Sequence, residues 1–242
     1  MVFEAISASL QHLAYSPPGW GGTLLSGLLS TLQIAFGAYG LAICIGLAGM
    51  LGKLYGGLAT KFILEIYTTI IRAVPELILL LLLYYAGTDL VNIILESLGY
   101  DTIDIDGLIA GIVVIGLVQG AFAIEVFRGA ILTIPRGQDE AAQAFGMPFW
   151  KRFRRIILPI MLPKSLPGLS NLWLITTKDT ALLAVVGFSE LALATKQAAG
   201  ATKSYFMFYV AAALIYLCVT IISNYFFSGV ERHYRRGQAK LA

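Results

Sequence analysis

Charged residues are scarce in this sequence, and their scarcity excludes an ordinary soluble domain. They make up 13% of the 242 residues, whereas a typical soluble domain has about 25%. Hydrophobic residues make up 58%, and the mean hydropathy is +0.79. Trp20–Gly52 and Ser204–Val230 carry no charge at all, and each is longer than the roughly 20 residues that a helix needs to cross a bilayer. The sequence therefore predicts a polytopic membrane protein.

Cysteine and histidine are also rare, which argues against metal or redox chemistry. Cys44 and Cys218 both fall inside apolar stretches, so we interpret them as apolar packing residues rather than as a disulfide or a metal pair. His12 and His233 lie near the two ends of the chain, whereas a membrane-embedded enzyme would need a constellation such as paired histidines and carboxylates. We therefore predict no catalytic residue, no metal and no cofactor.

Several other patterns are missing from the sequence. There is no GxxxxGK[ST] phosphate loop, so the chain has no ATP site of that kind. An ion-coupled secondary transporter usually has two matching halves, and no internal repeat is visible here. The N-terminus lacks a basic segment followed by an apolar one, so we expect the first span to act as its own insertion signal. The net charge of +3 is small, and the basic residues cluster beside apolar spans, which indicates membrane topology rather than nucleic-acid binding.

The apolar stretches predict an all-α fold, namely a polytopic membrane bundle of about five transmembrane helices in a single domain, residues 1–242. The expected spans are Leu24–Leu51, Phe62–Gly87, Gly107–Ile124, Leu166–Phe188 and Tyr205–Phe227. We expect Met1–Tyr15 to form a short amphipathic helix and Ser189–Ser204 to form a loop. The glycines of the first span allow helix backbones to approach closely.

Two of the expected spans contain ionisable residues, which are costly at membrane depth and usually face a protein interior or a water cavity. Either the second span has its first turns among the headgroups, or Arg72 and Glu76, four residues apart on one helix face, pair inside the bundle. Pro75 lies between them and is expected to kink or restart the helix. Lys178 and Asp179 interrupt the fourth span near its middle.

The charges predict which side of the membrane each connection faces. Lys53 and Lys61, the segment Arg128–Lys164 and the tail Glu231–Arg236 are basic, and five spans put them all on one side. Asp89–Asp106 carries acids and no base, and falls on the other side. By the positive-inside rule the basic segments and the C-terminus are cytoplasmic, and the N-terminus is outside.

The basic segment 128–167 is the one long polar stretch between apolar spans. Gln138–Phe145 predicts a short helix with Asp139 and Glu140 in its first turn, where the helix dipole favours acids. Gly146 suits the left-handed position after that helix. A second short helix, Phe149–Leu158, is expected to begin at Pro148 and to end before Pro159. On spacing alone, a loop that serves only topology and contact with anionic lipid stays an open alternative.

Several motifs together resemble one family. Glu140-Ala141-Ala142-x-Ala144-x-Gly146, followed by Ile156-x-Leu158-Pro159 and Pro163, resembles the EAA loop of ABC importer membrane subunits. Tyr67–Leu77 (YTTIIRAVPEL) and Lys178–Leu182 (KDTAL) are similar to segments of polar amino acid permeases. The pattern is closest to the Q-type permeases of the histidine/lysine/arginine/ornithine and opine branch. Ala73, where that branch usually has Gly, and Asp179, where some members have Ser, are departures, so the transported amino acid or opine stays open.

The resemblance implies a type I ABC importer permease in the bacterial inner membrane, with a periplasmic N-terminus. Segment 128–167 would hold the coupling helix that docks into a groove of a cytoplasmic ATPase dimer, which would hydrolyse the ATP. The coupling residues would be Asp139, Glu140, Ala141, Ala142, Ala144, Gly146 and Arg154. The implied partners are that ATPase, a second homologous permease or a copy of this chain, a periplasmic substrate-binding protein and an amino acid; no nucleic acid is implied.

A cationic amino acid needs an acid in the transport pathway and polar groups for its carboxylate and amine. Asp179 is the first candidate, because it interrupts an otherwise apolar span, and Glu125 and Glu76 are the others. The neighbouring polar candidates for the pathway are Lys178, Thr180 and Arg72. Structural pairing of Asp179 with Lys178 or Arg72 stays an open alternative, as does a substrate site carried by the partner permease alone.

Overall fold

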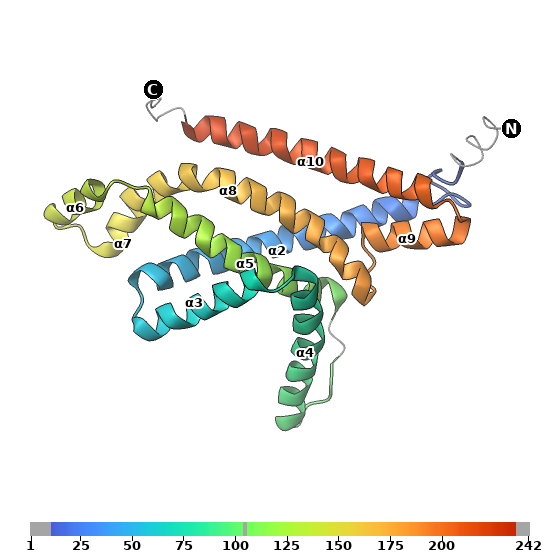
Figure 1. The fold of residues 1–242 in the computed structure, drawn as a ribbon, viewed down its shortest axis with the longest axis horizontal. Helices are drawn as coiled ribbons and strands as arrows, with labels where there is room; N and C mark the ends of the chain where they lie inside the picture. Colours follow the sequence, from blue (N-terminus) through green and yellow to red (C-terminus); the bar gives the residue numbers. More distant parts are fainter. Residues whose placement is uncertain (1–10, 104–105, 236–242) are drawn as a thin grey trace.

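The computed structural model describes residues 11–103 and 106–235, and all the regular structure in these residues is helical. The long helices run roughly along one direction, except for α4, which leaves the bundle at a steep angle (Figure 1). The elements are α2 (Gly21–Tyr55), α3 (Leu58–Ala73), α4 (Glu76–Ser97), α5 (Gly107–Leu132), α6 (Arg136–Ala144), α7 (Phe149–Arg152), η1 (Phe153–Ile157), α8 (Leu158–Asp179), η2 (Thr180–Val186), α9 (Leu191–Thr202) and α10 (Tyr205–Arg235).

The expected number of spans is confirmed. In the described part of the chain, α2, α4, α5 and α10 are each long and apolar enough to cross a membrane, and the bent segment Phe149–Thr202 makes a fifth if it is one span. Its two halves, Phe149–Val186 and Leu191–Thr202, meet at 51°. The expected amphipathic helix Met1–Tyr15 lies mostly outside the described residues.

Small residues bring α2 and α5 together at the centre of the bundle. A Cβ added at Gly46 would lie 2.6 Å from the Cβ of Ala123, and one added at Gly120 would lie 2.7 Å from Ile45. Such distances leave no room for a side chain, so the glycines permit the close contact that lipid-embedded helices use for packing. The interpretation of the first-span glycines as close-packing positions is confirmed at Gly46, whereas an added Cβ at Gly40 would meet nothing within 4 Å.

The second span differs from its expected form, because the helix breaks at Val74 and Pro75. Val74 is extended at φ −96° and ψ 139°, since a proline disfavours helical backbone in the residue before it. Arg72 therefore ends α3 while Glu76 begins α4, and within the described residues no ion pair joins them. Of the two alternatives for this span, the pairing of Arg72 with Glu76 on one helix face is therefore contradicted. The separate expectation that Pro75 kinks or restarts the helix is confirmed.

The second helix of the basic segment also differs from its expected form. Phe149–Leu158 was expected to be short, yet the chain stays helical from Phe149 through Val186. A π-helical turn, η1, immediately precedes Pro159 in the first turn of α8, and such a turn changes the backbone hydrogen-bonding pattern where proline lacks an N–H. Pro163 and Pro167 are inside α8. The basic segment therefore continues directly into the fourth span.

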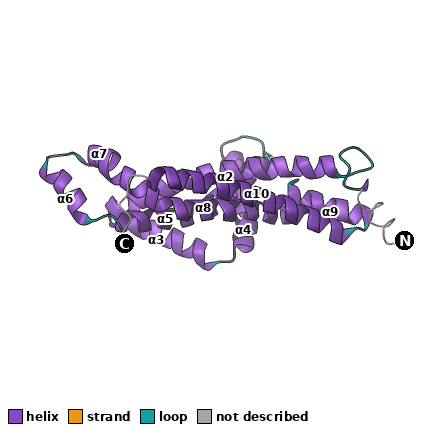
Figure 2. Cartoon of the chain, turned by 90° about the horizontal axis from the view of Figure 1, so that it is seen from above, coloured by secondary structure: helices purple, strands orange, loops and turns teal. Residues whose placement is uncertain are grey.

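The expected loop Ser189–Ser204 is mostly a helix, α9. Gly187 turns the chain at φ 89°, and the Glu190 side chain then accepts hydrogen bonds from the N–H groups of Ala192 and Leu193, both at 2.8 Å. This carboxylate starts the helix by capping donors that would otherwise be unsatisfied. Figure 2 shows α9 at one end of the bundle and α6 and α7 at the other.

The two cysteines are free, as expected, but both are exposed. Cys44 on α2 and Cys218 on α10 therefore face outward and do not pack in the core of this chain, contrary to the sequence-based interpretation. Their apolar character suits a surface that meets lipid or another membrane helix.

Candidate functional site

The short helix α6 stands at the end of the bundle, beyond the long helices (Figures 1 and 2). Ala142 is its one buried residue, at 3% exposed. The other coupling candidates on this helix, Glu140, Ala141 and Ala144, are exposed. The arrangement leaves a narrow face of small side chains and one carboxylate available for contact.

A tight turn at Gly146 ends this helix. Gly146 has φ +70°, and its N–H donates to the Gln143 carbonyl at 2.8 Å, while the Met147 N–H donates to the Ala142 carbonyl at 3.1 Å. These two bonds form a Schellman motif, in which the left-handed residue favours glycine. The predicted left-handed position of Gly146 after this helix is confirmed, and the turn has one defined geometry.

Contacts hold α6 to the helices behind it. Asp139 in the first turn of α6 forms an ion pair with Arg152 on α7. The Arg152 guanidinium also lies 5.9 Å from the ring centre of Phe149, and Phe149 packs edge-on against Tyr55 at the end of α2, with centroids 4.7 Å apart. Arg154 lies on the exposed side. The loop is therefore braced against the bundle.

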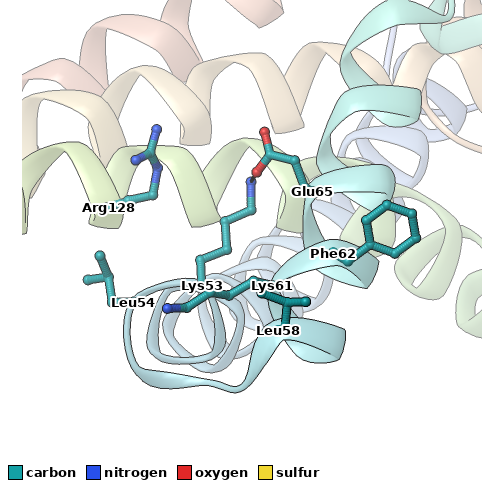
Figure 3. Close-up of a pocket in the computed structure, with 7 residues that line it drawn as sticks. All are labelled: Lys53, Leu54, Leu58, Lys61, Phe62, Glu65 and Arg128. Atoms are coloured by element: carbon teal, nitrogen blue, oxygen red, sulfur yellow. Dashed lines mark ion pairs between the residues drawn. The ribbon is translucent and has the colours of Figure 1, made fainter.

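A network of ion pairs joins α2, α3 and α5 near the same end. The Lys53 ammonium, whose side chain is 6% exposed, lies 2.7 Å from Glu65 and 2.8 Å from Glu125, and donates to Thr68 at 2.6 Å. Glu125 also accepts from Arg128 at 3.0 Å. Figure 3 shows Lys53 reaching from α2 to Glu65 on α3. Lys53 therefore links α2 to both α3 and α5, and Glu125 is its partner on α5.

A second polar cluster lies where α4, α5 and α8 meet. Glu76 and Asp179 line one small cavity of about 10 Å³ together with apolar residues. Gln119 is 1% exposed and donates its amide N–H to Asp179. Among the described residues the Gln119 carbonyl oxygen has no hydrogen-bond partner. Two carboxylates and an unpaired acceptor oxygen are therefore concentrated at one place within the bundle.

The remaining pathway candidates lie outside this cluster. Lys178 and Arg72 are exposed, and in the described part of the chain neither forms an ion pair with Asp179. Thr180 is buried and donates to the Thr177 carbonyl at 2.9 Å. Glu125 belongs to the Lys53 network. Of the predicted residues, the structure brings together only Glu76 and Asp179.

Sequence reasoning missed Gln119, Lys53 and Glu190. Gln119 is the one amide side chain in the expected uncharged span Gly107–Ile124, so the sequence alone could have indicated it as a candidate. Glu190 is fully buried, and besides capping α9 it accepts from Thr31 and Tyr216, each at 3.3 Å. No local sequence pattern predicts that Glu190 contacts Thr31 and Tyr216, which are distant in the chain.

No metal site is apparent in residues 11–103 and 106–235, where no group of three or more His, Cys, Asp or Glu side chains is placed to hold an ion.

Comparisons with known proteins agree with this architecture. The family model described as binding-protein-dependent transport system inner membrane component matches residues 40–236. The histidine/lysine/arginine/ornithine transport system permease protein HisQ of Salmonella typhimurium is 42% identical over 219 residues, which are 90% of this chain and 96% of that protein. The nopaline transport system permease protein NocQ of Agrobacterium fabrum is 37% identical over 230 residues, covering 94% of this chain and 98% of that protein.

Solved structures show the same fold. A crystal structure of an amino acid ABC transporter with histidines matches with a TM-score of 0.75 at 28% identity, over 88% of this chain and 95% of that one. An inward-facing structure of the MetNI methionine ABC transporter matches with a TM-score of 0.71 at 20% identity, over 91% of this chain and all of that one.

Proposed function

This chain belongs to the family of binding-protein-dependent transport system inner membrane components, and from that premise we propose that it is the permease subunit of an ATP-driven importer for basic amino acids or opines. The whole chain would form one permease domain, with residues 128–167 as its coupling loop. Relatives that it covers almost completely are named as permeases for histidine, lysine, arginine and ornithine or for nopaline. Their similarity supports the substrate class.

The observation that carries the substrate assignment is the cluster of Glu76, Asp179 and Gln119. Two carboxylates at membrane depth suit the positive side chain or α-amino group of a basic amino acid, since such groups usually mark substrate or ion pathways. The unpaired Gln119 oxygen offers a further acceptor for an N–H donor of the substrate. All three therefore favour a cationic ligand.

The cavity between these groups is too small for an amino acid. A space of about 10 Å³ holds one water molecule at most. Helix α4 must therefore move relative to α8 before substrate enters. The break at Val74 and Pro75 would provide the hinge for this movement. The Val74 N–H still donates to the Ile70 carbonyl and the Leu79 N–H to the Pro75 carbonyl, but among the described residues no backbone hydrogen bond joins α3 to α4 across the break.

The coupling assignment depends on the rigidity of the loop. ATP binding would close the ATPase dimer, and α6 would receive that movement through Glu140 and its alanines. The Gly146 turn and the Asp139–Arg152 ion pair would hold α6 rigidly to α7, so that a displacement of α6 would also move α7 and α8. Since the chain is helical from Phe149 to Val186, a displacement at α6 reaches Asp179 along one continuous element.

The partners follow from this assignment. An ABC ATPase dimer would bind at the end that carries α6. A second permease would cover faces that a single chain leaves open, such as those of α4 and α10, whose apolar spans are mostly exposed. The α2–α3 turn, α7 and the C-terminal end of α10, which carry basic residues, all lie toward that end (Figure 1). By the positive-inside rule this end is cytoplasmic and the N-terminus periplasmic.

The direct test is reconstitution in proteoliposomes with the ATPase and the periplasmic binding protein. We expect ATP-dependent uptake of radiolabelled arginine, lysine, histidine or ornithine, or of octopine or nopaline, with uncharged amino acids transported poorly. Uptake of uncharged amino acids at an equal rate would refute the basic substrate class while leaving the family membership intact.

A further inference from the structure

An open cavity at the basic end of the bundle is not explained by transport or coupling. It has a volume of about 500 Å³ and lies between the α2–α3 turn and the end of α5. Figure 3 shows the side chains that line it: Lys53, Leu54, Leu58, Lys61, Phe62, Glu65 and Arg128. Its size is that of a small-molecule site.

The charge in this cavity is unbalanced in favour of cations. Glu65 and Glu125 are both engaged by Lys53, and Glu125 also accepts from Arg128. Lys61 is exposed, and in the described part of the chain it has no carboxylate partner. Three cations therefore share two carboxylates, and the excess positive charge is centred near Lys61 and Arg128.

The same cavity is also lined by large apolar side chains whose exposure to water is unfavourable. Leu58 is 90% exposed and Phe62 is 67% exposed. They are four residues apart on α3, so they lie on one helix face. The cavity lies where α2, a helix long and apolar enough to cross a membrane, ends and α3 begins. The end of a membrane-spanning helix is expected at the headgroup level of one leaflet. At that depth an apolar surface beside cations matches a phospholipid, whose phosphate and acyl chains are joined.

We propose that this cavity binds the phosphate of an anionic phospholipid through Lys61 and Arg128, with Leu58 and Phe62 contacting its acyl chains. A free phosphate shares the headgroup chemistry but would gain nothing from the exposed Leu58 and Phe62. An acidic protein surface would likewise leave those two side chains in water. A phospholipid is the ligand that contacts both the cations, Lys61 and Arg128, and the apolar side chains, Leu58 and Phe62.

Native mass spectrometry tests the proposal with the full-length permease in detergent. The protein is mixed with equal amounts of phosphatidylglycerol and phosphatidylcholine that have identical acyl chains, and the retained lipids are counted. We expect the wild type to retain phosphatidylglycerol preferentially, and Lys61→Gln to weaken this retention about fivefold, as one cation near a charged lipid contributes. Phe62→Gln should lower retention as well, because it removes the acyl contact.

Lys196→Gln is the matched control, since Lys196 is an exposed cation on α9 at the other end of the bundle; it should retain the lipid as the wild type does. Equal retention by Lys61→Gln and the wild type would overturn the proposal. Two further arms separate the other sources. Complete displacement of the lipid by excess inorganic phosphate would identify a free-anion site, and displacement by the added ATPase subunit would identify a protein contact; either result also overturns the lipid.

Discussion

Replacing Gly146 by alanine tests whether the proposed coupling turn needs a residue that readily adopts a left-handed backbone conformation. An added Cβ at Gly146 meets nothing within 4 Å, so the substitution causes no steric clash with the rest of the chain. Its effect comes from φ +70°, a left-handed conformation that costs a residue with a Cβ about 1–2 kcal/mol. That cost corresponds to a roughly 5- to 30-fold smaller population of the native turn relative to alternatives.

The assay is ATP hydrolysis by the reconstituted transporter in the presence of liganded binding protein. We expect Gly146→Ala to lower the stimulated rate and the uptake together, because a turn that changes its geometry no longer passes the movement of α6 to α7. The thermal midpoint of the solubilised permease should change little, since the turn lies outside the packed bundle.

Gly200→Ala is the matched control. Gly200 lies inside α9, and a Cβ there also meets nothing within 4 Å, so the same chemical change is made in an ordinary helix. It should leave stimulated hydrolysis at the wild-type rate. If Gly146→Ala hydrolysed ATP like Gly200→Ala, the turn would not be part of the coupling path and the reasoning would be refuted.

Three further outcomes are expected. Asp179→Asn should raise the KM for arginine uptake about tenfold, because it removes a charged hydrogen-bond acceptor; an unaltered KM would sink the substrate assignment. Glu190→Ala should lower the free energy of unfolding by about 1–3 kcal/mol, through the lost cap and the buried groups left without a partner; an unchanged thermal midpoint of the solubilised permease would contradict the capping role. Asp139→Ala and Arg152→Ala should each lower stimulated ATP hydrolysis, and the double variant should be no worse than either alone; additive losses would show that the pair does not act as a unit.

The coupling loop was the part of this fold most predictable from sequence. The acids at Asp139 and Glu140 and the glycine at Gly146 are local signals with local physical causes: a helix dipole and a left-handed turn. The structure reproduces both, with α6 beginning within two residues of the expected start. Prolines were less informative, since Pro159 indicated a helix end and instead lies in the first turn of α8.

The distant contacts were not predictable in the same way. Lys53 and Glu125 are 72 residues apart, and Thr31 and Glu190 are 159 apart; each pair depends on helix packing that no window of sequence contains. The helix α9 was missed for the same reason, because its cap is a carboxylate whose burial depends on α2 and α10.

The cluster of Glu76, Asp179 and Gln119 was predictable only in part from the sequence. Asp179 was singled out as a polar interruption of an apolar span, and the structure places it at one small cavity with Glu76, the first residue of α4 after the break at Pro75. Gln119 carried a weaker signal of the same kind, an amide in an uncharged span.

The measurement that tests the central claim most directly is ATP hydrolysis by a reconstituted Glu140→Lys transporter. Glu140 is exposed on α6, so the fold and membrane insertion should be unaffected by the substitution. A reversed charge at the docking surface should weaken binding of the ATPase by about tenfold or more. Gln197→Lys places a new cation at an exposed position of α9 and serves as the control. The account predicts that only Glu140→Lys loses stimulation by liganded binding protein. Wild-type stimulation in that variant would contradict the assignment of α6 as the ATPase-docking helix.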